Sequence, residues 1–126
     1  MTEIDNLRKL FRDILLALEH IHSLGVIHGD VKVDNILHRG VYKLCDFGLA
    51  RKLGTQAEFR QGTLGYMAPE IEFTWDVTQA VDMWAFGVCV YELAVGNRPQ
   101  TRQGEVVFVE EEWKDETLRG LASLCL

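Results

Sequence analysis

Apolar residues along the first 24 positions recur at alternating steps of three and four, which is the spacing of one face of an α-helix. They are Ile4, Leu7, Phe11, Ile14, Leu18 and Ile21. The pattern predicts a helix from Ile4 to Leu24. Thr2 or Asp5 can cap its start, and Gly25 can end it in the left-handed conformation.

A second periodic segment runs from about Thr78 to Val95 and carries apolar residues on nearly every side. This arrangement predicts a helix that is buried all round. Asp82 lies within it, and a buried carboxylate is costly unless it is paired or hydrogen-bonded. Gly96 is a typical helix stop, and the polar stretch from Gln100 to Gly104 is predicted to be a linker.

The C-terminal part predicts a short extended piece at Val106 to Val109 and one more helix. Asp115 or Thr117 can cap that helix. Its apolar side consists of Leu118, Leu121, Ala122, Leu124 and Cys125. The pattern stops at Leu126 without a capping residue, so we expect the chain to be cut there.

Two short apolar runs, Ile36–Leu37 and Val41–Cys45, are predicted to be strands of a hairpin whose turn is 38–40. From Arg51 to Gly65 the chain is polar and has little periodicity, which predicts a long functional loop. The expected fold is therefore mainly α with short β-hairpins.

Composition is that of one soluble globular domain. The chain has 126 residues, of which 48% are hydrophobic and 25% charged, with a net charge of −6. The acidic balance argues against nucleic acid as a partner, and no apolar run is long enough to span a membrane. Three scattered cysteines, Cys45, Cys89 and Cys125, predict buried thiols in an intracellular, cytoplasmic protein.

Five polar side chains are concentrated between His28 and Asn35, in the sequence His-Gly-Asp-Val-Lys-Val-Asp-Asn. Apolar pairs lie on both sides, Val26–Ile27 before and Ile36–Leu37 after. A polar cluster held between two apolar anchors is typical of a loop that carries function.

Three further motifs follow that loop in order. They are Asp46-Phe47-Gly48, the segment from Gly62 to Glu70 that ends in Ala-Pro-Glu, and the helix that holds Asp82, Trp84 and Gly87. Together the four features resemble the C-terminal lobe of the eukaryotic protein kinases, serine/threonine type. The resemblance implies a partial kinase domain over residues 1–126, with catalytic loop 26–37, activation segment 46–70 and a core helix at about 78–95.

The resemblance also implies roles for individual residues in ATP-dependent transfer of a phosphoryl group to a serine or threonine of a protein substrate. Asp30 would accept the proton of the substrate hydroxyl, and Lys32 would lie beside the transferring phosphate. Asn35 and Asp46 would hold Mg²⁺. Thr63 would hydrogen-bond near Asp30 and help to receive the substrate.

The nucleotide-binding set implied by the resemblance is Lys32, Asp34, Asn35, Leu37, Cys45 and Asp46. Leu37 and Cys45 would flank the adenine. Asp82 would hold the catalytic loop through backbone N–H groups, and His28 and Phe47 would belong to a packed internal column. A regulatory protein partner is also expected.

The chain departs from the family pattern at three places. Gly29 stands where an arginine that meets an activation-loop phosphate is usual, so control by that phosphate is not expected. Val33 replaces a proline. The chain contains no Gly-rich loop, strand lysine or helix glutamate of an N-terminal lobe, so the lobe is expected to be absent from this chain and the chain alone to have little activity.

Two other functions remain open from the sequence. One is a catalytically inactive, kinase-derived module that binds another protein. The other is a small-molecule phosphotransferase, since the His-Gly-Asp triplet at 28–30 is similar to that family as well.

Overall fold

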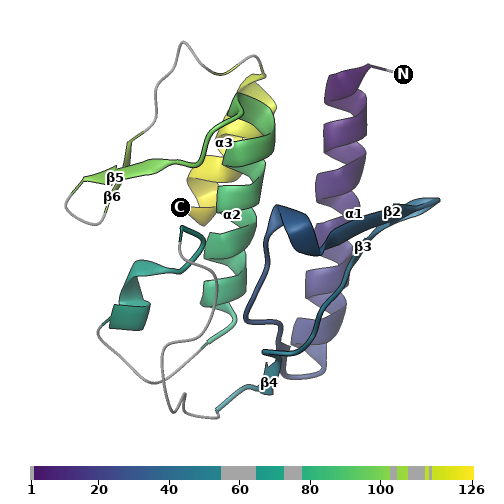
Figure 1. The fold of residues 1–126 in the computed structure, drawn as a ribbon, viewed down its shortest axis with the longest axis vertical. Coiled ribbons are helices and arrows are strands. Elements are labelled where there is room, and N and C mark those ends of the chain that lie inside the picture. The colour runs from purple at the N-terminus through teal and green to yellow at the C-terminus, as the bar shows by residue number, and fades with distance from the viewer. Residues whose placement is uncertain (1, 55–64, 73–77, 103–104, 108–112, 114) are drawn as a thin grey trace.

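The computed structural model describes residues 2–54, 65–72, 78–102, 105–107, 113 and 115–126 (Figure 1). Its elements are α1 (Glu3–Ser23), β1 (Val26–Ile27), η1 (Val33–Asn35), β2 (Ile36–Arg39), β3 (Val41–Leu44), β4 (Arg51–Lys52), η2 (Pro69–Glu72), α2 (Ala80–Val95), β5 (Gln100–Arg102), β6 (Glu105–Val107) and α3 (Glu116–Cys125). In the part of the chain that the structure describes, three helices and three two-stranded antiparallel sheets confirm the mainly α class with short hairpins.

Helix α1 is found where the sequence predicts it. Thr2 is the N-cap and forms a capping box with Asp5, in which each side chain accepts a hydrogen bond from the other residue's backbone N–H. Gly25 follows the helix with a φ of +73°, a conformation that glycine adopts without strain. The buried face of the helix consists of Phe11, Ile14 and Leu18.

Helix α2 forms the centre of the core, and its residues 85–91 are buried without interruption. Phe86 is 0% exposed and meets the edge of the Phe11 ring at 6.0 Å between ring centroids. The helix begins two residues later than the sequence predicts, and Gly96 caps its end with a φ of +100°.

Helix α3 packs closely against α2 because Gly87 has no side chain. A Cβ atom at this position would lie 2.6 Å from Cβ of Cys125, which is closer than real contacts allow. Asp115 caps α3 by accepting a hydrogen bond from the N–H of Leu118 at 3.1 Å. The same carboxylate forms an ion pair with Arg8 at 2.8 Å, so it also joins α3 to α1.

The β2–β3 hairpin is longer than the sequence predicts. His38 and Arg39 were expected in the turn, but they pair with Tyr42 and Val41 as part of the ladder. The His38 and Tyr42 rings stack at 4.3 Å, which favours extended backbone at both positions. Gly40 alone, with a φ of +74°, reverses the chain.

The hairpin lies beside α1 (Figure 1), and two hydrogen bonds join them. The carboxylate of Asp13 accepts from the N–H of Tyr42 at 3.0 Å, and the ammonium of Lys9 donates to the carbonyl of Gly40 at 3.1 Å. The end of β3, where Asp46 follows, is thereby positioned relative to the longest helix.

Two segments that were predicted to be irregular contain short strands. Arg51 and Lys52 form β4 and pair with Ile27 and Val26 of β1, so the expected loop begins later than Arg51. The predicted linker at Gln100 forms β5, which pairs with β6. Both strands are too short to show an alternating pattern in the sequence. Residues 55–64 and 108–112 lie outside the described part of the chain.

Among the described residues, the helices include none that is both long and apolar enough to cross a membrane.

The thiol of Cys89 provides a test of the α2 core. The residue is 0% exposed, and burial, reinforced by the charge of Glu92, raises its pKa to about 12. Because the thiolate is the reactive form, we expect iodoacetamide at pH 8 to modify Cys89 about a hundredfold more slowly in the native chain than in urea. Peptide mapping by mass spectrometry measures this rate, with the half-buried Cys45 as the internal reference. Equal rates for Cys89 in the two states would show that α2 is not buried as described.

Candidate active site

The loop after β1 is held by one buried carboxylate. Asp82 of α2 is 1% exposed. Its Oδ2 accepts a hydrogen bond from the backbone N–H of His28 at 2.8 Å, and its Oδ1 accepts from that of Gly29 at 2.9 Å. These are the hydrogen bonds expected of Asp82, and they explain how a carboxylate is tolerated inside α2.

A third partner of Asp82 comes from α1 and is one that the sequence reasoning missed. Nε2 of His22 lies 2.8 Å from Oδ2 of Asp82. The carbonyl of His22 accepts a further hydrogen bond from the side-chain amide of Gln79 at 2.9 Å. The sequence does contain an indication of this contact. His22 lies one turn beyond Leu18 on the buried face of α1, so its side chain is expected to point toward the core.

His28 connects the loop to the end of β3. The imidazole is fully buried, its Nδ1 accepts from the N–H of Asp30 at 3.0 Å, and its Nε2 lies 2.9 Å from the carbonyl of Cys45. With Nδ1 as acceptor, Nε2 must donate, which assigns the tautomer. The ring of Phe47 packs against the imidazole at 4.8 Å. His28 therefore positions other groups and is not exposed to a substrate.

Asp30, Lys32 and Asn35 lie together beyond that histidine. The ammonium of Lys32 is 3.7 Å from Oδ2 of Asp30. The side-chain amide of Asn35 donates to the carbonyl of Asp30 at 2.8 Å and lies 3.5 Å from its Oδ2. The side chains of Asp30 and Lys32 are 13% and 22% exposed, so the carboxylate is partly shielded and can still be reached.

The hairpin brings Asn35 and Asp46 to one end. Asn35 precedes β2, and its carbonyl accepts hydrogen bonds from the N–H of Cys45 at 2.8 Å and from the Cys45 thiol at 3.2 Å. Asp46 is the next residue, with a φ of +59°, a conformation uncommon outside glycine. Its Oδ1 accepts from the N–H of Gly48 at 3.2 Å.

The donor set at this end of the hairpin fits Mg²⁺. The side chain of Asn35 donates from Nδ2 in both of its contacts with Asp30, which leaves the amide oxygen to serve as an acceptor. Asn35 and Asp46 can thus offer hard oxygens, and Mg²⁺ commonly binds one or two such side chains together with phosphates. Within the described ranges there is no cluster of three or more His, Cys, Asp or Glu side chains that could hold a metal without such help.

The remaining candidate nucleotide-binding residues border this region. Leu37 is 46% exposed and lies opposite Lys43 in the hairpin, Asp34 is exposed, and Cys45 is half-buried. Thr63, the last candidate catalytic residue, lies outside the described part of the chain.

The segment that follows, from Gly65, is attached to the far end of α2. The hydroxyl of Tyr66 donates to the carboxylate of Glu92, and burial together with this hydrogen bond raises the pKa of Tyr66. Arg98 lies over the Tyr66 ring at 4.7 Å and pairs with Glu92 at 3.7 Å. Arg98 and Glu92 received no role in the sequence reasoning.

Gly29, which departs from the family pattern, is required by the local backbone. Its φ is +84°, and a Cβ atom would lie 2.9 Å from the carbonyl oxygen of Leu49. An arginine at this position would need both a strained backbone and a displaced neighbour. The loop after Asp46 thus approaches the loop at 26–37 more closely than a side chain at position 29 would permit.

We expect Gly29→Ala to lower the free energy of unfolding by at least about 1 kcal/mol, because the positive φ is unfavourable for alanine and the added methyl meets Leu49. Urea denaturation measures the change. Gly120→Ala is the matched control, since Gly120 lies within α3 with open space around it and alanine should leave stability equal or higher. A Gly29→Ala protein as stable as the parent would contradict the described approach of Leu49.

We expect Asp82→Asn to lower the free energy of unfolding by about 3 kcal/mol, because charge-assisted hydrogen bonds to buried N–H groups are worth about 1.5–3 kcal/mol each. The asparagine keeps the shape but presents a donor to groups that also donate. Asp34→Asn, on an exposed carboxylate, is the control and should change stability little. Equal stability of the two variants would exclude Asp82 as the anchor of the loop.

The sequence is similar to known proteins over most of its length. A family model described as "Protein kinase domain" matches residues 1–119. The chain is 43% identical over 98 residues to the ribosomal protein S6 kinase-related protein of Homo sapiens, which covers 75% of this chain and 24% of that protein. It is 42% identical over 100 residues to ribosomal protein S6 kinase alpha-4 of Homo sapiens, covering 74% and 13%.

A cGMP-dependent protein kinase of Toxoplasma gondii is 43% identical over 88 residues, which is 68% of this chain and 9% of that protein. The chain thus spans less than a quarter of the length of these curated relatives. Because the family match extends over residues 1–119 and two of these relatives are named as kinases, the chain belongs to the eukaryotic protein kinase family, in its serine/threonine branch.

Proposed function

We propose that this chain is the C-terminal lobe portion of a kinase domain and carries the residues that transfer a phosphoryl group from ATP to a serine or threonine of a protein. One observation carries the proposal. Asp30, Lys32 and Asn35 form a single cluster, and hydrogen bonds between Asn35 and Cys45 bring Asp46 to the same end of the hairpin. In this proposal the catalytic loop is 26–37 and the activation segment 46–70.

Asp30 is the group that orients the attacking hydroxyl and accepts its proton. Its carboxylate is partly shielded, and its backbone is fixed by the hydrogen bond from its N–H to His28 and by the amide of Asn35. A base whose position is fixed in this way supports transfer that depends on positioning more than on covalent chemistry. Lys32, 3.7 Å from the same carboxylate, places a positive charge where the transferring phosphate carries negative charge.

Asn35 and Asp46 are the residues that would hold Mg²⁺, through the amide oxygen and the carboxylate. An ion held by these two residues would supply positive charge that neutralises the phosphates. Leu37, Cys45 and Asp34 surround the hairpin end and would line the nucleotide site from this lobe. The three free cysteines agree with a reducing, intracellular setting.

The protein substrate would lie across the segment that ends at Glu70. Thr63 would hydrogen-bond near Asp30 and help to receive the substrate. The lack of space for a side chain at Gly29 supports a mode of regulation that does not use a phosphate–arginine pair at this position.

The 126 residues alone should turn over little ATP, because no Gly-rich loop or strand lysine is present to hold the phosphates from the other side. A chimera supplies those parts. In this chimera, the part of the chain that aligns with ribosomal protein S6 kinase alpha-4 over 100 residues replaces the corresponding segment of that kinase. We expect the chimera to phosphorylate a serine- and threonine-containing peptide library and the isolated chain to show little transfer.

Three variants of the chimera test the assigned roles. Asp30→Asn and Asp46→Asn should each lower kcat about a hundredfold or more, because each removes a group required in the transition state. Arg39→Gln, on an exposed position of β2 between these two residues, should leave kcat unchanged. A folded but inactive chimera, made from an active parent kinase, would instead support the inactive binding module.

A further inference from the structure

Three side chains meet at the C-terminal end of α2. The hydroxyl of Tyr66 donates to the carboxylate of Glu92. Nε of Arg98 lies 3.7 Å from Oε2 of the same carboxylate, and its guanidinium carbon is 4.7 Å from the centroid of the Tyr66 ring. Each of the three residues therefore contacts the other two, and we call them the Tyr66–Glu92–Arg98 cluster.

Arg98 also lies beside the residue that precedes Tyr66. Gly65 has a φ of +94°, and a Cβ atom there would lie 2.9 Å from Nη1 and 3.3 Å from Cδ of Arg98. A planar guanidinium can stack on an aromatic face, which the compact ammonium of a lysine cannot do in the same way. One arginine side chain therefore contacts two successive residues of the segment that begins at Gly65.

The backbone on both sides of Arg98 directs this side chain toward the cluster. Gly96 ends α2 with a φ of +100°, and its N–H donates to the carbonyl of Glu92 at 2.8 Å. Pro99 favours extended backbone at the residue before it, and β5 begins directly afterwards. The chain therefore changes direction at the end of α2, and the turn places Arg98 over Glu92 and Tyr66.

The cluster lies apart from the groups that would transfer the phosphoryl group. Asp82, which holds the loop with Asp30, is near the start of α2, and Glu92 is about three helical turns farther along. In the proposed function the protein substrate would lie across the segment with Tyr66, whereas ATP would lie at the end of the β2–β3 hairpin. A change in the cluster should therefore affect binding of the protein and leave binding of ATP unchanged.

We propose that Arg98 is a positioning residue for the protein substrate. It holds Gly65 and Tyr66 against the end of α2 and so fixes the segment that receives the substrate. This role rests on the proposed function, because it takes the substrate to lie across that segment. Loss of the guanidinium should weaken binding of the protein substrate and leave the transfer step unchanged.

Steady-state kinetics of the chimera test this role. For this test the chimera is extended to residues 1–119 of this chain, the range that the family model matches, so that it includes the whole cluster. We expect Arg98→Met to raise the KM for the best peptide of the library about tenfold, with kcat and the KM for ATP within about twofold of the parent. Arg98→Lys keeps the charge beside Glu92 and loses the stacking on Tyr66, so its peptide KM should lie between those of the parent and Arg98→Met.

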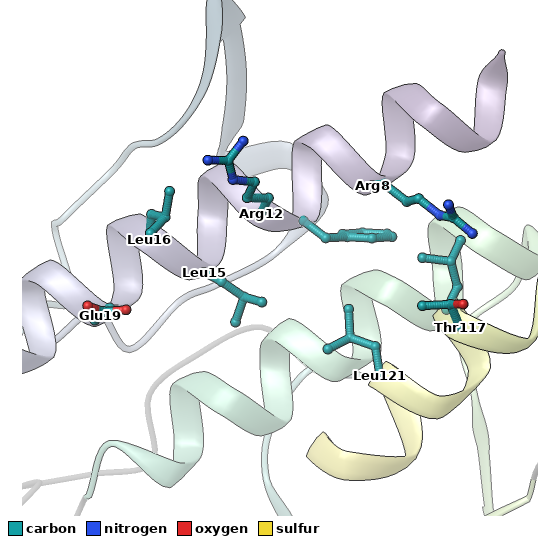
Figure 2. A pocket seen from close by; sticks show the side chains of 9 residues that line it. Arg8, Arg12, Leu15, Leu16, Glu19, Thr117 and Leu121 are labelled. Carbon is teal, nitrogen blue, oxygen red and sulfur yellow. The ribbon is translucent and has the colours of Figure 1, made fainter. Parts of the chain in front are cut away.

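Arg8→Met is the matched control for the loss of an arginine ion pair. The Arg8 side chain is 51% exposed, compared with 48% for Arg98, and it pairs with Asp115 at 2.8 Å. Figure 2 shows it extending from α1 toward α3, so its role is to join two helices. We expect this variant to keep the KM for peptide and for ATP. A loss of stability alone lowers the folded fraction and with it the apparent kcat, and leaves KM unchanged.

A Tyr66→Leu background tests whether Arg98 acts through the ring. In this background the guanidinium has no aromatic face to lie over, so adding Arg98→Met should change the peptide KM by less than about twofold. The same increase as in the parent would show that Arg98 acts through another contact, and it would overturn the proposal.

Failure of this proposal can be distinguished from failure of the proposed function. If the parent chimera is active and Arg98→Met leaves the peptide KM unchanged, or raises both KM values equally, Arg98 has no positioning role and the proposed function stands. If the parent chimera is folded and inactive, the proposed function fails and the role of Arg98 fails with it. Circular dichroism shows whether each variant is folded, and Arg98→Lys carries the same test if the methionine variant does not fold.

Discussion

The buried carboxylate of Asp82 is the interaction on which the arrangement of the candidate site depends. Three N–H groups from two separate parts of the chain surround it, the backbone of His28 and Gly29 in the loop and the ring of His22 in α1. A charge in a core helix must be satisfied, and in the part of the chain that the structure describes these three donors satisfy it. These hydrogen bonds fix the start of the loop against α2. The ring of His28 in turn hydrogen-bonds the N–H of Asp30 and the carbonyl of Cys45, so it positions both the next part of the loop and the end of β3.

The same requirement explains an unusual residue in the loop. For the N–H of Gly29 to reach Asp82, the backbone adopts a positive φ, and the chain after Asp46 passes within van der Waals distance of it. Both conditions favour glycine over any residue with a side chain. Local packing therefore explains why glycine occupies position 29, whatever its effect on regulation.

Much of this arrangement could be predicted from the sequence, because the long periodic segments determine it. The start and end of α1 followed from Thr2, Gly25 and the apolar spacing between them. Strands such as β4 and β5 could not be predicted, since two or three residues carry no period and their pairing partners lie far away or across a turn. The contact of His22 with Asp82 could not be predicted, because the sequence shows that a polar residue lies on a helix face but does not show which distant residue it contacts.

Helix α2 also acts as a spacer between two anchored segments. Near its start Asp82 holds the loop with Asp30, and ten residues later Glu92 accepts the hydroxyl of Tyr66 from the segment that ends at Glu70. At 1.5 Å per residue, the two anchors are about 15 Å apart along the helix axis. A rigid α-helix keeps that distance constant. The separation between the loop that carries Asp30 and the segment that carries Tyr66 is therefore set by a number of helical residues in the core.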